Sequence, residues 1–269
     1  MATPLAARLP VVGPARVPAP YGLFSVLQFR DSFDRHWEAG GVQWQSLDGT
    51  VNLGVVGAPQ ADPADTSGLP KTFARKGQTD EAGVFTLYGQ QKVTPGPGWN
   101  QESASERARD LLTMLEERTV EMVLAGAIGD LAPSFSSATV VGASLDLVEV
   151  IADLENFLGD NYGSRGVIHL SRDNAIRGLS TSAVLETRGN GLFTKLGTPV
   201  VAGSGYPSDA AYATSALVGY RSEVFDNVGQ PYDPLDKSTN DLFAIAERTY
   251  SIGFEAKALA LVTIGDSPA

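Results

Sequence analysis

The sequence predicts a mixed α+β fold, and three patterns support that prediction. Residues 101–128 repeat apolar side chains at steps of three and four, which is typical of a long amphipathic helix. Residues 134–221 alternate short apolar strands with shorter helices, the order expected of a central sheet with covering helices. Residues 241–265 add two strands, near 242–252 and 254–264, and the second is expected to close the fold beside an earlier element.

Composition narrows the class of protein. Hydrophobic residues make up 43% of the 269 residues, enough for a sizeable core. Charged residues are only 19%, and a chain with so few charges often covers much of its surface with partners. The balance is acidic, with 20 Lys and Arg against 31 Asp and Glu and a net charge of −11. Sequence-specific binding to nucleic acid is therefore disfavoured, because phosphate neutralisation supplies most of that affinity.

Several chemistries are excluded by residue counts. The chain has no cysteine, so disulfides, thiolate catalysis and iron–sulfur clusters are ruled out. It has two histidines, too few for a multi-histidine metal site. His169 lies in the apolar run 166–170 and is expected to be a packed core or interface residue. His36, beside Trp37 and several charged residues, is expected to be half-exposed in a turn or at a strand edge.

The N-terminal 20 residues carry five prolines, which predicts an extended arm. A disordered tail is the alternative, but the apolar residues Leu5, Leu9, Val11 and Val12 favour docking on the chain's own domain or on a neighbour. The segment lacks the continuous apolar region of a signal peptide, and no window of ~18 apolar residues occurs anywhere. We therefore expect no membrane span and synthesis in a cytoplasm.

The first strands are expected around a turn. Residues 42–45 alternate, Asp48-Gly49 supplies a hairpin turn, and residues 50–56 follow as its partner strand. Residues 58–83 form a polar stretch without periodicity, expected to be a functional or mobile loop. Residues 84–93 predict another strand.

The long helix 101–128 is expected to start with a capping box of Ser103 and Glu106 and to end at Gly129 and Pro133. Glu116, Glu117 and Glu121 are assigned to its solvated face, in preference to an acid pair. The apolar stripe consists of Ala108, Leu111, Leu112, Leu115, Thr119, Met122, Val123 and Gly126.

Shorter elements follow. A strand is expected at 139–142, then a helix over 145–158 capped by Ser144 and stopped by Gly159. A strand at 166–170 leads into a short helix capped by Ser171, and an Asn190-Gly191 turn separates two later strands. Asp146, Glu149, Asp153 and Glu155 are expected on a wet helix face.

No pattern in the chain indicates an active site. The glycine-dense residues 203–207 lack the spacing of a phosphate-binding loop and are expected to be a tight turn. No GxSxG motif occurs, and Asp226, Asp233, Asp236 and Asp241 do not have the spacing of a calcium loop. We therefore expect no catalytic residue, no cofactor-binding residue, no metal ligand and no cofactor, and a structural protein in place of an enzyme.

The order of elements resembles the major capsid proteins of tailed bacteriophages, which have the Hong-Kong-97-like fold shared with encapsulin shells. The residues that carry this resemblance are 154–175, 196–207 and 247–262, which are similar to capsid proteins from phages of actinobacteria. The resemblance implies a layout in five parts. These are an N-terminal arm (1–35), an extended loop with flanking strands (36–100), a spine helix of a peripheral domain (101–133), an axial domain (134–240) and returning strands of the peripheral domain (241–269).

The resemblance also implies partners and a location. The chain would self-assemble as hexamers and pentamers into the icosahedral head of a virion in the host cytoplasm. Further partners would be portal, scaffolding or decoration proteins, with weak contact to packaged double-stranded DNA through arginines such as Arg107, Arg109 and Arg118, and no membrane. Lys71, Lys76 and Lys92 are possible donors for a covalent crosslink, although ordinary salt bridges between subunits are favoured. The alternatives are an encapsulin-type nanocompartment shell and an α/β enzyme without a recognisable motif.

Overall fold

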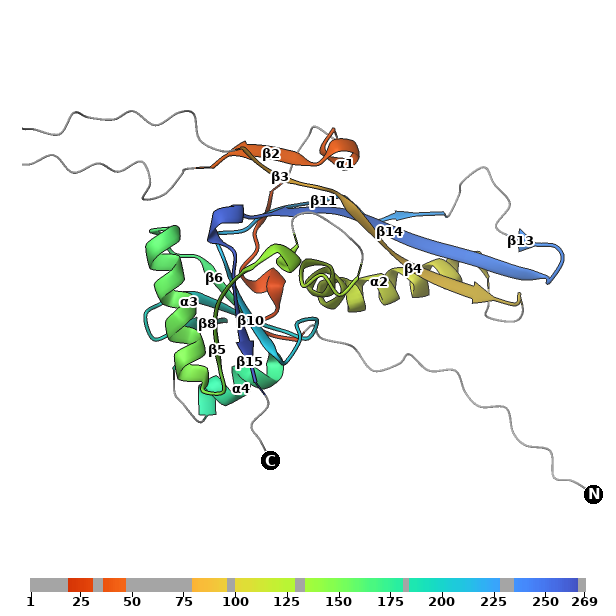
Figure 1. The fold of residues 1–269 in the computed structure, drawn as a ribbon. Helices are drawn as coiled ribbons and strands as arrows, with labels where there is room; N and C mark the ends of the chain where they lie inside the picture. Colours follow the sequence, from red (N-terminus) through yellow and green to blue (C-terminus); the bar gives the residue numbers. More distant parts are fainter. Residues whose placement is uncertain are drawn as a thin grey trace, which may run out of the picture.

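The structure is a computed structural model that describes residues 19–30, 36–46, 79–95, 100–128, 134–180, 184–227 and 235–265. A seven-stranded sheet forms the centre of a body, and a long strand pair projects from that body together with a long helix (Figure 1). The predicted mixed α+β fold is confirmed.

The seven-stranded sheet has the order β5-β15-β10-β6-β9-β8-β7. β6 and β9 are parallel, β10 is antiparallel to β6 and β15, and β5 is parallel to β15. Its strands are β5 (Thr139–Ser144), β6 (Val167–Ser171), β7 (Leu185–Arg188), β8 (Gly191–Thr194), β9 (Pro199–Gly203), β10 (Ala210–Thr214) and β15 (Ala260–Ile264). β6 and β10 are buried at every residue, as central strands of a covered sheet should be.

Two helices, α3 (Leu147–Asn161) and α4 (Arg172–Ser180), cover one face of this sheet. The predicted strand at 166–170 and the short helix after it are confirmed, and the Ser171 hydroxyl accepts the Asn174 N–H at 3.2 Å. The core between helices and sheet includes Leu147, Val150, Ile151, Leu154, Leu158, Ile168, Leu170, Ala211, Ala213, Ala260 and Val262.

α3 starts and ends later than predicted. Asp146 caps it by accepting the Val148 N–H at 2.9 Å, whereas Ser144 accepts the Asp146 N–H at 3.0 Å. The helix continues through Gly159 and ends before Gly163, which has φ +64°. A glycine stops a helix where it takes the left-handed conformation, and Gly159 does not.

The six-stranded sheet is centred on β14 (Asp241–Gly253). β4 (Phe85–Val93) pairs antiparallel along one edge of β14 over nine residues. The other edge of β14 carries three strands in succession, and β1 (Phe29–Arg30) lies parallel to the first of them. The three are β11 (Val218–Arg221), β12 (Phe225–Asp226) and β13 (Leu235–Asp236).

The helix α2 (Gln101–Leu124) covers one face of the β4–β14 pair through small residues. Ala104 and Ala108 pack with Ala244 and Ala246. At Gly89 a Cβ would lie 2.3 Å from the carbonyl oxygen of Ala108, so helix and strand are in backbone contact there. Small residues therefore set the spacing of this layer.

Both ends of α2 differ from the prediction. Asn100 is the cap: its side chain accepts the Ser103 N–H at 2.9 Å, and the Ser103 hydroxyl accepts the Asn100 N–H at 3.0 Å. The predicted Ser103–Glu106 box is wrong because Ser103 already lies inside the first turn. At the other end Gly126 takes φ +74° and the Ala127 N–H donates to Met122 at 2.9 Å, so the helix stops before the predicted Gly129.

The first hairpin also differs from the prediction. β2 (Val42–Gln45) pairs antiparallel with β3 (Thr79–Ala82), which falls in the stretch expected to be a loop. The sequence of β3, Thr-Asp-Glu-Ala, has little strand propensity, and tertiary contacts hold it: the Ser251 hydroxyl donates to the Ala82 carbonyl at 3.2 Å. The predicted strand 50–56 and the Asp48-Gly49 turn lie outside the described residues. A four-residue helix, α1 (Trp37–Gly40), precedes β2.

The two sheets divide the chain at other residues than the predicted boundaries. Residues 241–269 were expected to stay together with the long helix, but β15 pairs with β5 and β10 in the other sheet. Likewise β11, β12 and β13 lie within the predicted 134–240 segment but belong to the sheet of β14. The reason is that η4 (Ala256–Ala258) separates β14 from β15 and the chain passes there from one sheet to the other.

The predicted Asn190-Gly191 turn is one residue late, because Gly189 with φ +58° and Asn190 connect β7 to β8.

Candidate functional site

The three glutamates of α2 that were predicted on a solvated face form a carboxylate cluster. Glu121 is 1% exposed; its Oε1 accepts the Leu23 N–H at 3.1 Å and its Oε2 accepts the Gly205 N–H at 2.8 Å. Glu117 accepts the Phe24 N–H at 2.8 Å. The solvated-face prediction is therefore wrong for these residues, because backbone donors from two distant segments satisfy the carboxylates.

Glu116 faces the sheet from the same helix. Its Oε2 accepts a hydrogen bond from the Arg248 guanidinium at 2.8 Å and another from the Tyr250 hydroxyl at 2.6 Å. Burial and the bond to Glu116 raise the pKa of Tyr250 well above its ordinary value, so the phenol stays a proton donor. The cluster consequently ties α2 to β14 as well as to the N-terminal segment.

Burial raises the pKa values of Glu117 and Glu121, and the backbone N–H groups that donate to them act in the opposite direction. The charged form of each carboxylate is thus held at a desolvation cost that the donors offset only in part. Removing one of these donors would leave a buried carboxylate oxygen without a hydrogen-bond partner. We take the cluster as a structural junction of the molecule.

The buried histidine is part of the core, as predicted. His169 is fully buried; its Nδ1 lies 3.0 Å from the Tyr206 hydroxyl and its Nε2 lies 2.9 Å from the Thr214 hydroxyl. Burial lowers the pKa of His169 to about 3, so the ring is neutral at physiological pH. His36 is exposed in the turn before α1.

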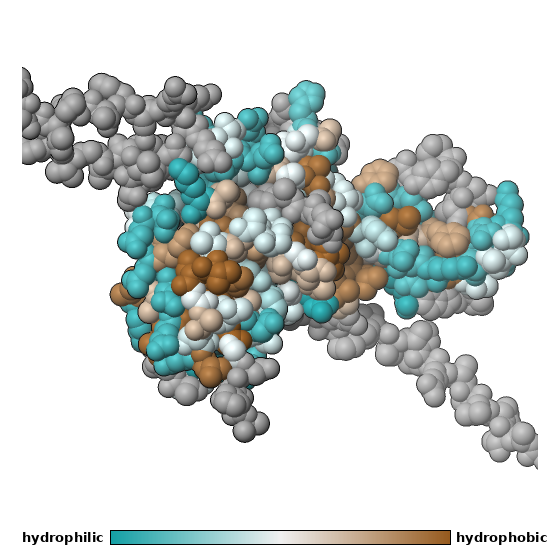
Figure 2. Space-filling view, viewed as in Figure 1, coloured by the Kyte–Doolittle hydropathy of each residue, from teal (hydrophilic) through white to brown (hydrophobic). Residues whose placement is uncertain are grey.

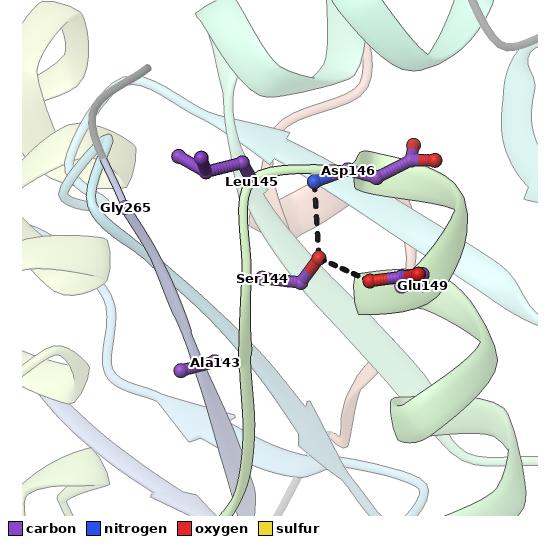
Figure 3. A pocket seen from close by; sticks show the side chains of 6 residues that line it. All are labelled: Ala143, Ser144, Leu145, Asp146, Glu149 and Gly265. Carbon is purple, nitrogen blue, oxygen red and sulfur yellow. Dashed lines mark hydrogen bonds between the residues drawn. The ribbon is translucent and has the colours of Figure 1, made fainter. Parts of the chain in front are cut away.

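The described part of the chain offers no group of three His, Cys, Asp or Glu side chains that could hold a metal ion, and no helix long and apolar enough to cross a membrane. An open hollow of about 520 Å³ lies at the start of α3, lined by Ala143, Ser144, Leu145, Asp146, Glu149 and Gly265 (Figure 3). Its polar groups form the helix start: the Ser144 hydroxyl accepts from the Asp146 N–H and donates to Glu149 at 2.6 Å (Figure 3). The Ser144 hydroxyl is therefore already engaged in capping contacts of α3.

The β4–β14 pair has an open face opposite α2. Tyr88, Phe243 and Ile245 point away from the helix and are 63%, 39% and 36% exposed. Phe225 of β12 adds a fourth large apolar side chain to the same face, since it pairs with Glu247, the register partner of Tyr88. We call these four residues the open ribbon face. On the part of the projection visible in Figure 2, apolar residues lie between polar ones.

The outer side of α2 is also apolar. Leu111 and Leu115, predicted in the core stripe, are exposed together with Met114, while Leu112 is buried. The stripe was predicted from spacing alone, but the buried face of α2 is rotated from it and includes Glu116, Val120 and Glu121 in place of Leu111 and Leu115.

The remaining predicted residues make ordinary contacts. Lys92 forms an ion pair with Asp241 of its own chain at 2.9 Å, and Arg109 forms one with Asp226. Asp236 accepts from the Ser238 hydroxyl at 2.6 Å. Lys71, Lys76 and Asp233 lie outside the described residues. On α3, Glu155 accepts from Thr194 at 2.5 Å and Thr198 at 2.8 Å, so this part of the predicted wet face in fact holds the β8–β9 connection.

A helix-covered sheet, a long helix lying on a projecting strand pair and a separate two-stranded sheet together define the class of fold: it is the fold of phage capsid chains. A chain from the capsid of the native GTA particle matches with a TM-score of 0.60 and 11% identity, over 97% of this chain and 95% of that chain. A chain of Mycobacterium phage Ogopogo matches with a TM-score of 0.54 and 16% identity, over 96% of each chain. A chain of the phage G assembly of gp27 major capsid proteins and gp26 decoration proteins matches with a TM-score of 0.50 and 10% identity, over 93% of this chain and 91% of that one.

At these identities the likeness is one of fold, and it confirms the predicted Hong-Kong-97-like class. No protein-family model and no curated protein matches the sequence.

Proposed function

We propose that this chain is the structural subunit of a phage head, assembling through hexamers and pentamers into an icosahedral shell around double-stranded DNA. The observation that carries the proposal is the open ribbon face. Tyr88, Phe243 and Ile245 of the β4–β14 pair, joined by Phe225 of β12, lie on one face, whereas the other face of the pair packs against α2. Burying a side chain of this size contributes about 1.5–3 kcal/mol. A second copy of the chain is the natural cover, because the fold is shared with chains of assembled capsids.

In this proposal the predicted parts keep their roles. Residues 1–35 act as the arm, 36–100 as the extended loop and 101–133 as the spine. Residues 134–240 act as the axial domain at the centre of each ring, except for β11, β12 and β13, which join 241–253 in the peripheral domain, whereas β15 joins the axial sheet. Portal, scaffolding and decoration proteins are further proposed partners, and the shell assembles in the host cytoplasm and becomes part of the virion. No catalytic step is assigned to the chain.

Electron microscopy and analytical ultracentrifugation of the native protein test the proposal directly. We expect closed megadalton particles. Monomers or dimers only, at high concentration and with the natural assembly partners present, would contradict it and favour the enzyme alternative. Particles filled with protein cargo instead of DNA would favour the nanocompartment alternative.

A variant tests the assembly surface. Replacing Phe243 and Ile245 together by serine removes apolar area from exposed positions, so the subunit should stay folded while particle yield falls at least tenfold. Gln90→Ser is the matched control, because Gln90 is exposed on the same face as the partner of Ile245 but is polar. Equal particle yield from both variants would show that the open ribbon face is not an assembly surface.

Contact with DNA is proposed to be weak. The chain has a net charge of −11, and of the three arginines considered, Arg109 is already paired with Asp226. Filter binding should therefore show only salt-sensitive affinity for DNA. Tight binding that persists at about 200 mM salt would contradict this part of the proposal.

A further inference from the structure

The backbone of residues 20–24 is fixed to three distant elements. Arg172 of α4 donates to the Pro20 carbonyl at 3.1 Å, and the Ala202 N–H of β9 donates to the Tyr21 carbonyl at 2.7 Å. Beyond Gly22, the Leu23 and Phe24 N–H groups donate to Glu121 and Glu117 of α2 at 3.1 and 2.8 Å. Four of the five residues 20–24 are thus held by a backbone hydrogen bond to a distant element.

Packing supports the same attachment. Leu23 and Leu27 are buried among Val120, Leu124 and Tyr250 in the core between the two sheets. Gly22 lies against α2 so closely that a Cβ there would be 2.3 Å from Glu117 Oε1. The segment approaches the helix at its carboxylates and has no room for a side chain at that point.

We propose that Glu117 and Glu121 form a latch that holds residues 22–24 on α2, and that this attachment is needed for the chain to assemble. The second half of this statement rests on the proposed shell function; the first half does not. The latch would thus couple the folded subunit to its assembly: a subunit with the latch open stays folded but assembles poorly.

The chemistry of Glu121 makes the latch specific for a carboxylate. Both of its oxygens accept a backbone N–H, one from Leu23 and one from Gly205. A glutamine has the same shape but only one acceptor oxygen, so one N–H would face the amide NH₂ and lose its partner. Glu117 accepts one bond from the segment, so glutamine there keeps an acceptor. The latch therefore predicts a graded response, with Glu121→Gln stronger than Glu117→Gln.

Other charged and titratable groups surround the latch without replacing it. Glu116 lies on the same helix and Arg172 approaches from α4, and both act electrostatically on Glu117. Tyr206, which follows β9, interacts electrostatically with both latch carboxylates, and burial together with these charges raises the pKa of its hydroxyl. Arg248 and Tyr250 of β14 donate hydrogen bonds to Glu116. The donors that reach Glu121 are backbone N–H groups, which do not titrate.

Hydrogen exchange on the unassembled full-length subunit tests the latch. In Glu121→Gln we expect the amides of residues 22–24 to exchange at least tenfold faster than in the wild type, with β6 and β10 unchanged. Glu106→Gln, an exposed glutamate on the same helix, is the control and should leave exchange unchanged. Unchanged exchange of residues 22–24 in Glu121→Gln would overturn the latch.

If Glu121→Gln fails to fold, Gly22→Ala gives the second readout. The added Cβ displaces Glu117, so the Phe24 amide should exchange faster while the seven-stranded sheet keeps its protection; no change would overturn the latch.

The link between the latch and assembly is tested separately, by comparing the particle yield of Glu121→Gln with that of the chain lacking residues 1–18. Comparable losses support the coupling, and wild-type yield from an open latch overturns it. A wild-type chain that forms no particles contradicts the proposed function and leaves the exchange result standing.

Discussion

The seven-stranded body and the projecting ribbon of α2, β4 and β14 are built on opposite principles. The body buries branched aliphatic side chains on a sheet covered by α3 and α4, with strands such as β6 and β10 buried throughout. The ribbon has a thin core of alanines on one face and large apolar side chains exposed on the other. The body therefore has the packing of a self-sufficient domain, whereas one face of the ribbon is left uncovered by the described residues. This contrast is consistent with the proposed role as a shell subunit.

The largest expected effect is on the core of the body. Leu154→Ala removes a fully buried side chain and should lower the free energy of unfolding by about 3–4 kcal/mol. Leu115→Ala on the outer side of α2, 39% exposed, should cost less than about 0.5 kcal/mol in the isolated subunit. Urea unfolding of both variants measures the difference. Equal losses would show that the outer side of α2 is packed within the monomer, which would contradict the difference in packing between body and ribbon.

The spacing of the ribbon should depend on one glycine. Gly89→Ala places a Cβ against the Ala108 carbonyl and should cost about 1–3 kcal/mol, because backbone must move to admit it. Gly159→Ala is the control: nothing lies within 4 Å of its added Cβ inside α3, so it should stabilise by about 0.5–1 kcal/mol. Thermal melting of the two variants should shift in opposite directions, and shifts of the same sign would contradict the proposed backbone contact.

Acidification should weaken the body through His169. The folded-state pKa is lowered to about 3, so below pH 6.5 the unfolded chain takes up a proton that the folded state refuses. The free energy of unfolding then falls by about 1.4 kcal/mol per pH unit from this group, or about 2 kcal/mol by pH 5. Urea unfolding between pH 7 and 5 should show this slope in the wild type and lose it in His169→Gln. A slope retained in the variant would assign it to other groups.

The ribbon should respond to pH in the opposite sense. The pKa values of Glu117 and Glu121 are raised, so as pH falls the folded state takes up protons before the unfolded chain does. These groups thus add stability as pH falls toward their ordinary values. Compared with Glu117→Gln, the wild type should gain stability between pH 7 and 5. If the variant gained as much as the wild type, the desolvated charge would not be at Glu117.

The smallest effect is expected at the ribbon surface. Arg109→Ala breaks the ion pair with Asp226 on a half-exposed arginine and should cost less than about 1 kcal/mol, less still at high salt. Urea unfolding at low and high salt measures it. A larger, salt-independent loss would mean that the guanidinium packs into the ribbon core, so that the ribbon would be more tightly packed there than its exposure indicates.

The sequence by itself determined the elements whose signal is local. The long helix, the strand that became β4, β6 with the helix after it, and the two C-terminal strands were all predictable, because apolar periodicity and caps act within a few residues. The burial of His169 was predictable too, since an apolar run surrounds it. Together with the resemblance in three segments, this gave the class of fold.

Only the tertiary structure decided the rest. Glu117 is half-buried and Glu121 is buried because N–H groups 93 and 98 residues away in the chain donate to them. No local pattern in the sequence shows that these donors lie next to the helix. The pairing of β2 with the weak strand β3, and the passage of the chain from β14 to β15 between two sheets, likewise follow from contacts distant in sequence. Periodicity shows that one helix face is apolar, but which apolar residues are buried and which stay exposed is set by the elements that pack against the helix.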